Sequence, residues 1–160
     1  FDRTKSFLLD DECKFVREVD KDLPNAERIW ELPDPSVNII KASIFCDDSA
    51  VMDSAYVLQR ELGQLFTFAP SGNAWIDAMQ PGVSKASGIA QLAEHYGIDR
   101  DEVIAFGDSM NDYEIIRFVG TGCAMENARP ALKAVADRVV GCNRDHAVQQ
   151  ELRHVLESLA

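Results

Sequence analysis

Short apolar runs alternate with amphipathic segments along the second half of the chain. The apolar runs predict buried strands over residues 103–106, 122–125 and 138–140. Apolar residues at helical spacing predict helices over residues 84–96, 112–119, 128–136 and 145–159. Strands that alternate with helices form a parallel sheet with helices packed on it, so this pattern predicts an α/β fold.

The middle of the chain predicts a smaller α/β unit in the order strand, helix, strand, strand. Its helix is expected to begin at a cap on Ser49 and to end at Leu62, before Gly63. A turn is expected over residues 70–73. The predicted strands cover residues 38–46, 65–69 and 74–79.

Pro81 and Gly82 mark the expected boundary between two domains. The first domain covers residues 1–81, and the second covers residues 82–160. Residues 1–34 are rich in charge and show no period that predicts a particular element.

A glycine turn directly after the predicted strand at 103–106 carries the strongest chemical signal. Asp108 follows this turn, and Asn111 and Asp112 come within the next four residues. Ligands bind at the carboxyl ends of parallel strands, and hard carboxylate oxygens suit Mg²⁺. The spacing therefore predicts a magnesium site, with the Asn111 amide available to an anionic oxygen. The structural alternative is that Asp108 forms a turn and Asp112 caps a helix.

Two further residues lie where the same edge of the sheet is expected. Lys85 opens a predicted helix, where a cation is unusual unless it faces a phosphate or a carboxylate. It could equally be a solvated surface lysine. Asn127 follows the predicted strand at 122–125, and we expect it to cap the next helix.

The composition is that of a globular protein with an acidic surface. Of its 160 residues 46% are hydrophobic, and the formal net charge of −11 argues against nucleic-acid or anionic-membrane partners. No apolar stretch is long enough to span a membrane, and no secretory signal is visible. The cysteines lack zinc-site spacing, so reduced thiols in a cytoplasmic protein are expected. They are Cys13, Cys46, Cys123 and Cys142.

These segments together resemble the C-terminal half of haloacid dehalogenase superfamily phosphatases. The chain is most similar to the Cof-type branch, in which an α/β cap of type C2 is inserted into the core. The resemblance rests on Lys85, Gly107-Asp108-Ser109-Met110-Asn111-Asp112, Ala124-Met125-Glu126-Asn127-Ala128, Ala136-Asp137 and the segment Arg144-Asp145-His146-Ala147-Val148.

The resemblance implies a fold, a reaction and a set of residue roles. Residues 82–160 would form the rear half of a Rossmann-like parallel-sheet core, and residues 1–81 the rear part of the cap. Family members hydrolyse phosphomonoesters with Mg²⁺ through an aspartyl-phosphate intermediate. By resemblance, Asp108 is catalytic and binds the metal, which Asp112 also holds. Lys85 is catalytic and contacts the phosphate, and Asn111 binds the phosphate of a small phosphorylated metabolite.

The sequence departs from the family pattern in two places. No Asp-x-Asp-x-Thr run, which carries the family nucleophile, occurs in these residues, and the upstream Ser/Thr phosphate motif is also absent. The chain starts with Phe1, so we expect that an N-terminal segment is missing and that the incomplete core self-associates. His146 stands where the family usually has glycine.

Two other functions stay open on the sequence alone. Without a nucleophile the chain could be a non-catalytic, metal-binding or structural part of a protein. The run Phe106-Gly107-Asp108-Ser109 also resembles the nucleophile block of GDSL serine esterases, with Ser109 as nucleophile. No downstream Asp-x-x-His pair supports that esterase alternative.

Overall fold

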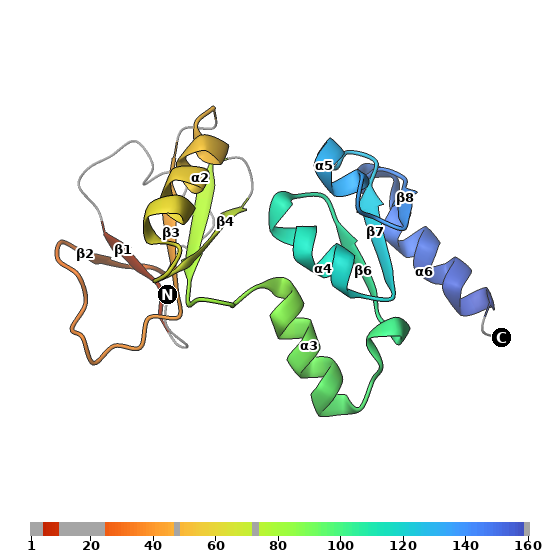
Figure 1. Ribbon diagram of the computed structural model, residues 1–160, viewed down its shortest axis with the longest axis horizontal. Helices are drawn as coiled ribbons and strands as arrows, with labels where there is room; N and C mark the ends of the chain where they lie inside the picture. Colours follow the sequence, from red (N-terminus) through yellow and green to blue (C-terminus); the bar gives the residue numbers. More distant parts are fainter. Residues whose placement is uncertain (1–4, 10–24, 47–48, 72–73, 159–160) are drawn as a thin grey trace. The chain divides into compact units, whose positions relative to one another are not determined.

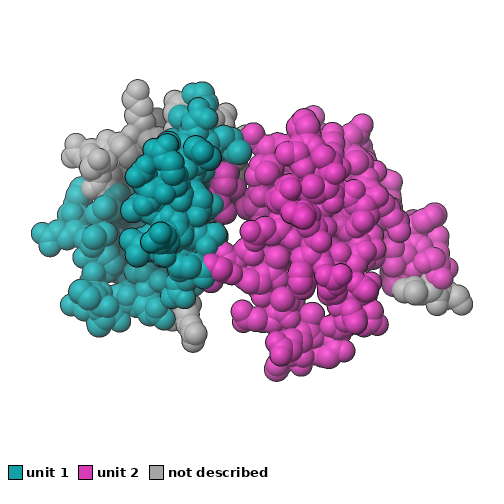
Figure 2. Space-filling model, in the orientation of Figure 1, with its two compact units in different colours: residues 1–68, 74–81 teal, residues 69–73, 82–160 magenta. Residues whose placement is uncertain are grey.

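The computed structural model describes residues 5–9, 25–46, 49–71 and 74–158 (Figure 1). Its contacts divide the chain into two compact units, which Figure 2 colours separately. The first unit comprises residues 1–68 and 74–81, and the second comprises residues 69–73 and 82–160.

The second unit is built on the predicted parallel sheet. Its strands are β6 (Ile104–Gly107), β7 (Thr121–Met125) and β8 (Arg138–Val140), in that spatial order. Both pairings are parallel, with Gly107 opposite Ala124 and Met125 opposite Val140. The carboxyl ends of all three strands therefore lie at the same edge of this sheet.

Helices pack on this sheet in the alternating order that the sequence predicts. The helix α4 (Tyr113–Phe118) contacts β6, β7 and α3 (Lys85–Tyr96). Two others, α5 (Pro130–Lys133) and α6 (Ala147–Ser158), contact β7 and β8 respectively. The single-turn 3₁₀ segments are η1 (Arg100–Glu102), η2 (Met110–Asp112) and η3 (Asn143–Asp145).

Local sequence signals explain the bounds of α3. Ser84 caps its start, since the Ser84 hydroxyl accepts from the Ser87 N–H at 3.2 Å and the Ser87 hydroxyl accepts from the Ser84 N–H at 2.9 Å. Gly97 ends the helix with φ +66°, a conformation that glycine adopts without strain. The predicted helix at 84–96 is confirmed.

The core of the second unit lies between the sheet and its helices. Ile116 of α4 and Leu132 of α5 are fully buried there. Burial of such apolar side chains is the main stabilising contribution to the unit. The buried cluster consists of Ala105, Ile116, Val119, Ala124, Met125, Ala128, Leu132 and Ala147.

The first unit contains the predicted order of strand, helix, strand and strand. Its sheet has the order β3, β5, β4, and α2 packs on it through the buried residues Val51, Ala55 and Ile76. The elements are β3 (Lys41–Phe45), α2 (Val51–Leu62), β4 (Thr67–Ser71) and β5 (Trp75–Met79). Strands β3 and β5 are antiparallel, with Ser43 opposite Asp77.

Three local features differ from what the sequence predicts or were not predicted. Strands β1 (Phe7–Leu9) and β2 (Glu27–Ile29) form a parallel pair that the sequence pattern does not reveal. Helix α2 is preceded by Ala50, without a side-chain cap, so Ser49 is not its N-cap. Strand β4 extends through Pro70 and Ser71, where we predicted a turn. The other two residues of the predicted turn, 72–73, lie outside the described residues. Cys13 also lies outside them.

The described helices include none that is both long and apolar enough to cross a membrane.

Candidate functional site

Polar residues that follow the three strands lie at the carboxyl-end edge of the parallel sheet. Asp108 follows β6, Asn127 lies two residues after β7, and Asn143 lies three residues after β8. Short connections at this edge place the side chains of Asp108 and Asn127 and the backbone N–H of Asn143 within hydrogen-bonding reach of one another.

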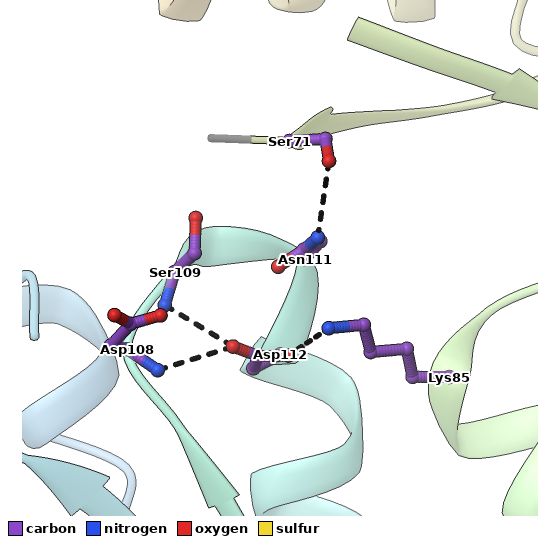
Figure 3. Close-up of polar contacts among 6 residues, drawn as sticks. All are labelled: Ser71, Lys85, Asp108, Ser109, Asn111 and Asp112. Carbon is purple, nitrogen blue, oxygen red and sulfur yellow. Dashed lines mark hydrogen bonds and ion pairs between the residues drawn. The ribbon is translucent and has the colours of Figure 1, made fainter. Parts of the chain in front are cut away.

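Asp112 is the central residue of the loop after β6. Its side chain is only 9% exposed, and one carboxylate oxygen, Oδ1, pairs with the ammonium group of Lys85 (Figure 3). The other oxygen, Oδ2, accepts the backbone N–H groups of Asp108 at 3.1 Å and of Ser109 at 3.2 Å. Asp112 therefore holds the loop closed and joins it to the start of α3.

Gly107 makes this closure possible because it has no side chain. A Cβ atom at Gly107 would lie 2.5 Å from Asp112 Cβ and 2.9 Å from Asp112 Oδ2. Real Cβ atoms do not approach other heavy atoms so closely, so the loop requires glycine here for steric reasons.

Asp108 presents an exposed carboxylate at this edge. Its Oδ2 atom accepts a hydrogen bond of 3.2 Å from the side-chain amide of Asn127. In the described part of the chain, this amide is the one side-chain group that bonds the Asp108 carboxylate. The remaining lone pairs of Asp108 are available to a ligand.

Asn127 does not cap the following helix, and that prediction is wrong. The N-cap of α5 is Arg129, and the helix spans four residues rather than the predicted nine at 128–136. The Asn127 side chain instead bonds Asp108 and the loop after β8. Its position at the edge of the sheet that carries the site is as predicted, whereas its hydrogen bond to Asp108 could not be predicted from its residue type.

Asn111 contributes a buried oxygen atom to the same loop. Its amide nitrogen lies 3.5 Å from the Ser71 hydroxyl, at the outer limit of a hydrogen bond. Its Oδ1 atom is buried and has no hydrogen-bond partner among the described residues. A buried acceptor without a partner marks a place where a ligand or a bound water is expected to donate.

The donor set of this loop fits a magnesium ion. The described residues contain no cluster of three or more His, Cys, Asp or Glu side chains that could enclose a metal. Mg²⁺, however, commonly takes one or two carboxylates and completes its octahedron with water and substrate phosphate. The exposed Asp108 carboxylate supplies a hard oxygen of this kind.

Some of the predicted site residues contact one another, whereas others bond different partners. Lys85 and Asp112 are in direct contact, whereas the Asp108 side chain is held by Asn127. Ser109, the nucleophile of the esterase alternative, has no histidine in hydrogen-bond contact within the described segments. Its N–H group serves to anchor Asp112 instead.

Comparison with known proteins decides the family. The family of haloacid dehalogenase-like hydrolases matches residues 4–152. The chain belongs to this family. The α/β fold and the resemblance to Cof-type members are thereby confirmed.

Two curated relatives are named as phosphatases. The chain is 36% identical over 117 residues to the Escherichia coli 5-amino-6-(5-phospho-D-ribitylamino)uracil phosphatase YbjI, covering 73% of this chain and 43% of that protein. It is 32% identical over 126 residues to the HMP-PP phosphatase of Citrobacter koseri, covering 78% of this chain and 46% of that protein. The chain thus spans less than half the length of these relatives.

Solved structures show the same fold. A protein from Streptococcus mutans superposes with a TM-score of 0.85 at 21% identity, over 94% of this chain and 57% of that one. A hypothetical protein from Geobacillus kaustophilus superposes with a TM-score of 0.68 at 31% identity, over 98% of this chain and 59% of that one.

Proposed function

We propose that this chain supplies part of the active site of a Mg²⁺-dependent phosphatase that hydrolyses a small phosphorylated metabolite. The observation that carries the proposal is the closed loop after β6, in which Asp112 binds Lys85 while Asp108 stays exposed beside it. Membership of the haloacid dehalogenase-like hydrolases supports the same reaction class and argues against the esterase alternative.

In this proposal, two site residues serve the metal ion and two serve the phosphate. Asp108 binds the metal ion through its exposed carboxylate, and Asp112 holds the metal site, directly or through a ligand water. Lys85 and Asn111 bind the phosphoryl oxygens, which carry negative charge during transfer. Bound Mg²⁺ would neutralise part of that charge.

The reaction in this proposal is a double displacement. An aspartate carboxylate attacks the phosphorus, the ester P–O bond breaks, and the leaving alkoxide takes a proton from water. Water then cleaves the aspartyl phosphate to give inorganic phosphate. The family pattern for this nucleophile, Asp-x-Asp-x-Thr, does not occur in the printed sequence, so the proposal assigns the nucleophile to residues outside it.

The domain assignment belongs to the same proposal. Residues 82–160 act as part of the catalytic core, and residues 1–81 act as part of a cap that selects the substrate. The names of the two relatives suggest the first compounds to assay: 5-amino-6-(5-phospho-D-ribitylamino)uracil and HMP-PP.

The second candidate function is a non-catalytic, metal-binding role. It is favoured by one observation, the absence of the nucleophile pattern from these residues. The two functions differ in turnover, since a metal-binding protein without a nucleophile would bind Mg²⁺ but release no phosphate.

The test is a phosphate-release assay of the natural gene product that contains these residues. We expect turnover of p-nitrophenyl phosphate with Mg²⁺, and its loss in EDTA and in Asp108→Ala. Glu94→Ala, which removes an exposed carboxylate from α3, is the matched control and should retain full activity. Turnover that persists in EDTA or in Asp108→Ala would refute the proposal.

A further inference from the structure

The side-chain amide of Asn127 connects the ends of all three strands of the parallel sheet. Its Nδ2 atom donates to Asp108 Oδ2 at 3.2 Å, at the end of β6. Its Oδ1 atom accepts the backbone N–H of Asn143 at 3.4 Å and lies 3.5 Å from Cys142 Sγ, after β8. Asn127 itself lies just after β7.

The two partners fix which way the amide faces. A carboxylate oxygen can only accept a hydrogen bond, and a backbone N–H can only donate one. The Asn127 nitrogen must therefore face Asp108, and its oxygen must face Asn143. The opposite orientation would place two acceptors against each other at Asp108 and two donors against each other at Asn143.

Helix capping does not account for this side chain. Helix α5 begins after Arg129, and its first turn receives no side-chain cap. Both polar atoms of Asn127 are used in contacts between loops instead. Both Asn127 and Asp108 are exposed, so their hydrogen bond contributes little to global stability.

We propose that Asn127 is a positioning residue that orients the Asp108 carboxylate for Mg²⁺. The inference rests on the proposed function, in which Asp108 binds the metal. The amide occupies Oδ2, and no side chain among the described residues bonds Oδ1 of Asp108, which can face the ion. The contacts to the loop after β8 hold the Asn127 amide in place, and the amide in turn orients the Asp108 carboxylate. Metal binding then does not have to pay the entropic cost of ordering that carboxylate.

Substitutions at position 127 should weaken Mg²⁺ binding when they remove the donor to Asp108. Asn127→Leu keeps the side-chain shape but removes both polar atoms. Asn127→Asp keeps an acceptor for the Asn143 N–H but places a second negative charge against Asp108. Groups that orient a metal-binding carboxylate contribute roughly 10- to 100-fold to metal affinity. We therefore expect the dissociation constant for Mg²⁺ to be about tenfold larger in Asn127→Leu.

The test measures Mg²⁺ binding by isothermal titration calorimetry of the natural gene product that contains these residues. Asn127→Leu should weaken binding about tenfold, and Asp108→Asn should weaken it further. Asn143→Ala is the matched control, because it removes a neighbouring amide side chain but keeps the backbone N–H that bonds Asn127. It should bind Mg²⁺ as tightly as the unsubstituted protein.

Two additional measurements separate positioning from a purely structural role. The thermal unfolding midpoint of Asn127→Leu should match that of the unsubstituted protein. In the phosphate-release assay, the Mg²⁺ concentration for half-maximal activity should rise, while KM for p-nitrophenyl phosphate at saturating Mg²⁺ should not change. If Asn127→Leu has a lowered thermal unfolding midpoint, and partial unfolding accounts for its weaker Mg²⁺ binding, the positioning role of Asn127 is refuted.

The outcomes distinguish this inference from the proposed function. If Asp108→Asn weakens Mg²⁺ binding but Asn127→Leu stays within twofold of the unsubstituted protein, the positioning role is refuted and the proposed function stands. If the unsubstituted protein does not bind Mg²⁺, or Asp108→Asn binds it equally well, the proposed function itself is refuted.

Discussion

The ammonium group of Lys85 pairs with the carboxylate of Asp112, 27 residues further along the chain. The partners differ in environment, since the Lys85 side chain is 51% exposed and that of Asp112 is 9% exposed. Asp112 is thus a buried carboxylate whose oxygens are matched by one ammonium and two backbone N–H groups. The pair joins the start of α3 to the loop after β6 (Figure 3).

This asymmetry predicts that Asp112 matters more for stability than Lys85. Asp112→Asn removes an acceptor that three donors share, so at least one donor loses its partner and the free energy of unfolding should fall by about 2 kcal/mol. Lys85→Met removes a half-exposed ion pair, which contributes about 0.5 kcal/mol. Urea unfolding of both variants measures the difference.

Phosphate release tests the role of Lys85 separately from its small contribution to stability. Under the proposed function, Lys85 contacts the substrate, so Lys85→Met should lose activity at temperatures where it is fully folded. Equal losses of stability in Lys85→Met and Asp112→Asn would contradict the role of Asp112 as the buried anchor.

Gly107→Ala should destabilise the second unit through a steric clash. The added Cβ would meet Asp112 Cβ at 2.5 Å, and the backbone of the loop would have to move to relieve the contact. Overpacking of this kind costs about 1–3 kcal/mol, and the Asp112 hydrogen bonds would be lost with the movement. Thermal and urea unfolding measure the loss.

Gly88→Ala is the matched control for this substitution. Gly88 lies within α3, and a Cβ there would meet no heavy atom within 4 Å apart from the nearby backbone of its own helix. Alanine is favoured over glycine inside a helix by about 1 kcal/mol, so this variant should be more stable. Destabilisation by both substitutions would show that the clash at Asp112 is not the cause.

The sequence predicted best those features that depend on neighbouring residues. Helix α3 begins after the Ser84 cap and ends before Gly97, because a capping hydroxyl and a left-handed glycine act within one turn. Strand β8 has the predicted bounds, Arg138–Val140. The parallel sheet followed from the alternation of apolar runs with amphipathic segments.

Features that depend on distant partners could not be predicted in the same way. Asn127 has the residue type of a helix cap, but its amide is taken by Asp108 and Asn143, which are 19 and 16 residues away. Strands β1 and β2 have three residues each, too few to show a period. The loop with Asp108 and Asp112 was visible in sequence, whereas the residue that bonds the Asp108 carboxylate was not. The site roles of these residues stay predictions.

Cys123 should resist thiol reagents in the folded protein. It lies in β7 with no exposed surface, and burial, reinforced by the negative charge of Glu151, raises the pKa of its thiol. The thiolate is the reactive form, so both access and ionisation are suppressed. Timed labelling at pH 8 followed by mass spectrometry should show modification of the partly exposed Cys46 and Cys142 before Cys123.

The raised pKa also predicts a dependence of stability on pH. A thiol whose pKa is higher in the folded state contributes fully below its unfolded value, near 9.0, and this contribution is lost as pH rises through the folded pKa. The free energy of unfolding should therefore fall above pH 9. Cys123→Ala should show a smaller fall over that range, and labelling in urea should modify all cysteines equally.

His146→Gly should make the protein more stable, because His146 adopts a backbone conformation that favours glycine. Its φ is +56° and its ψ is +32°, and it is the one described non-glycine residue with positive φ. A left-handed L-residue costs about 1–2 kcal/mol, and the greater freedom of glycine in the unfolded chain offsets part of the gain. A net increase of about 0.5–1 kcal/mol in the free energy of unfolding is expected.

Two control substitutions test that reasoning. His146→Ala removes the imidazole but keeps Cβ, so its stability should stay near that of the unsubstituted protein. His154→Gly places glycine inside α6, where it should cost about 0.5 kcal/mol. If His146→Ala is stabilised as much as His146→Gly, loss of the imidazole rather than relief of the backbone accounts for the gain. Urea unfolding of all three variants measures these differences.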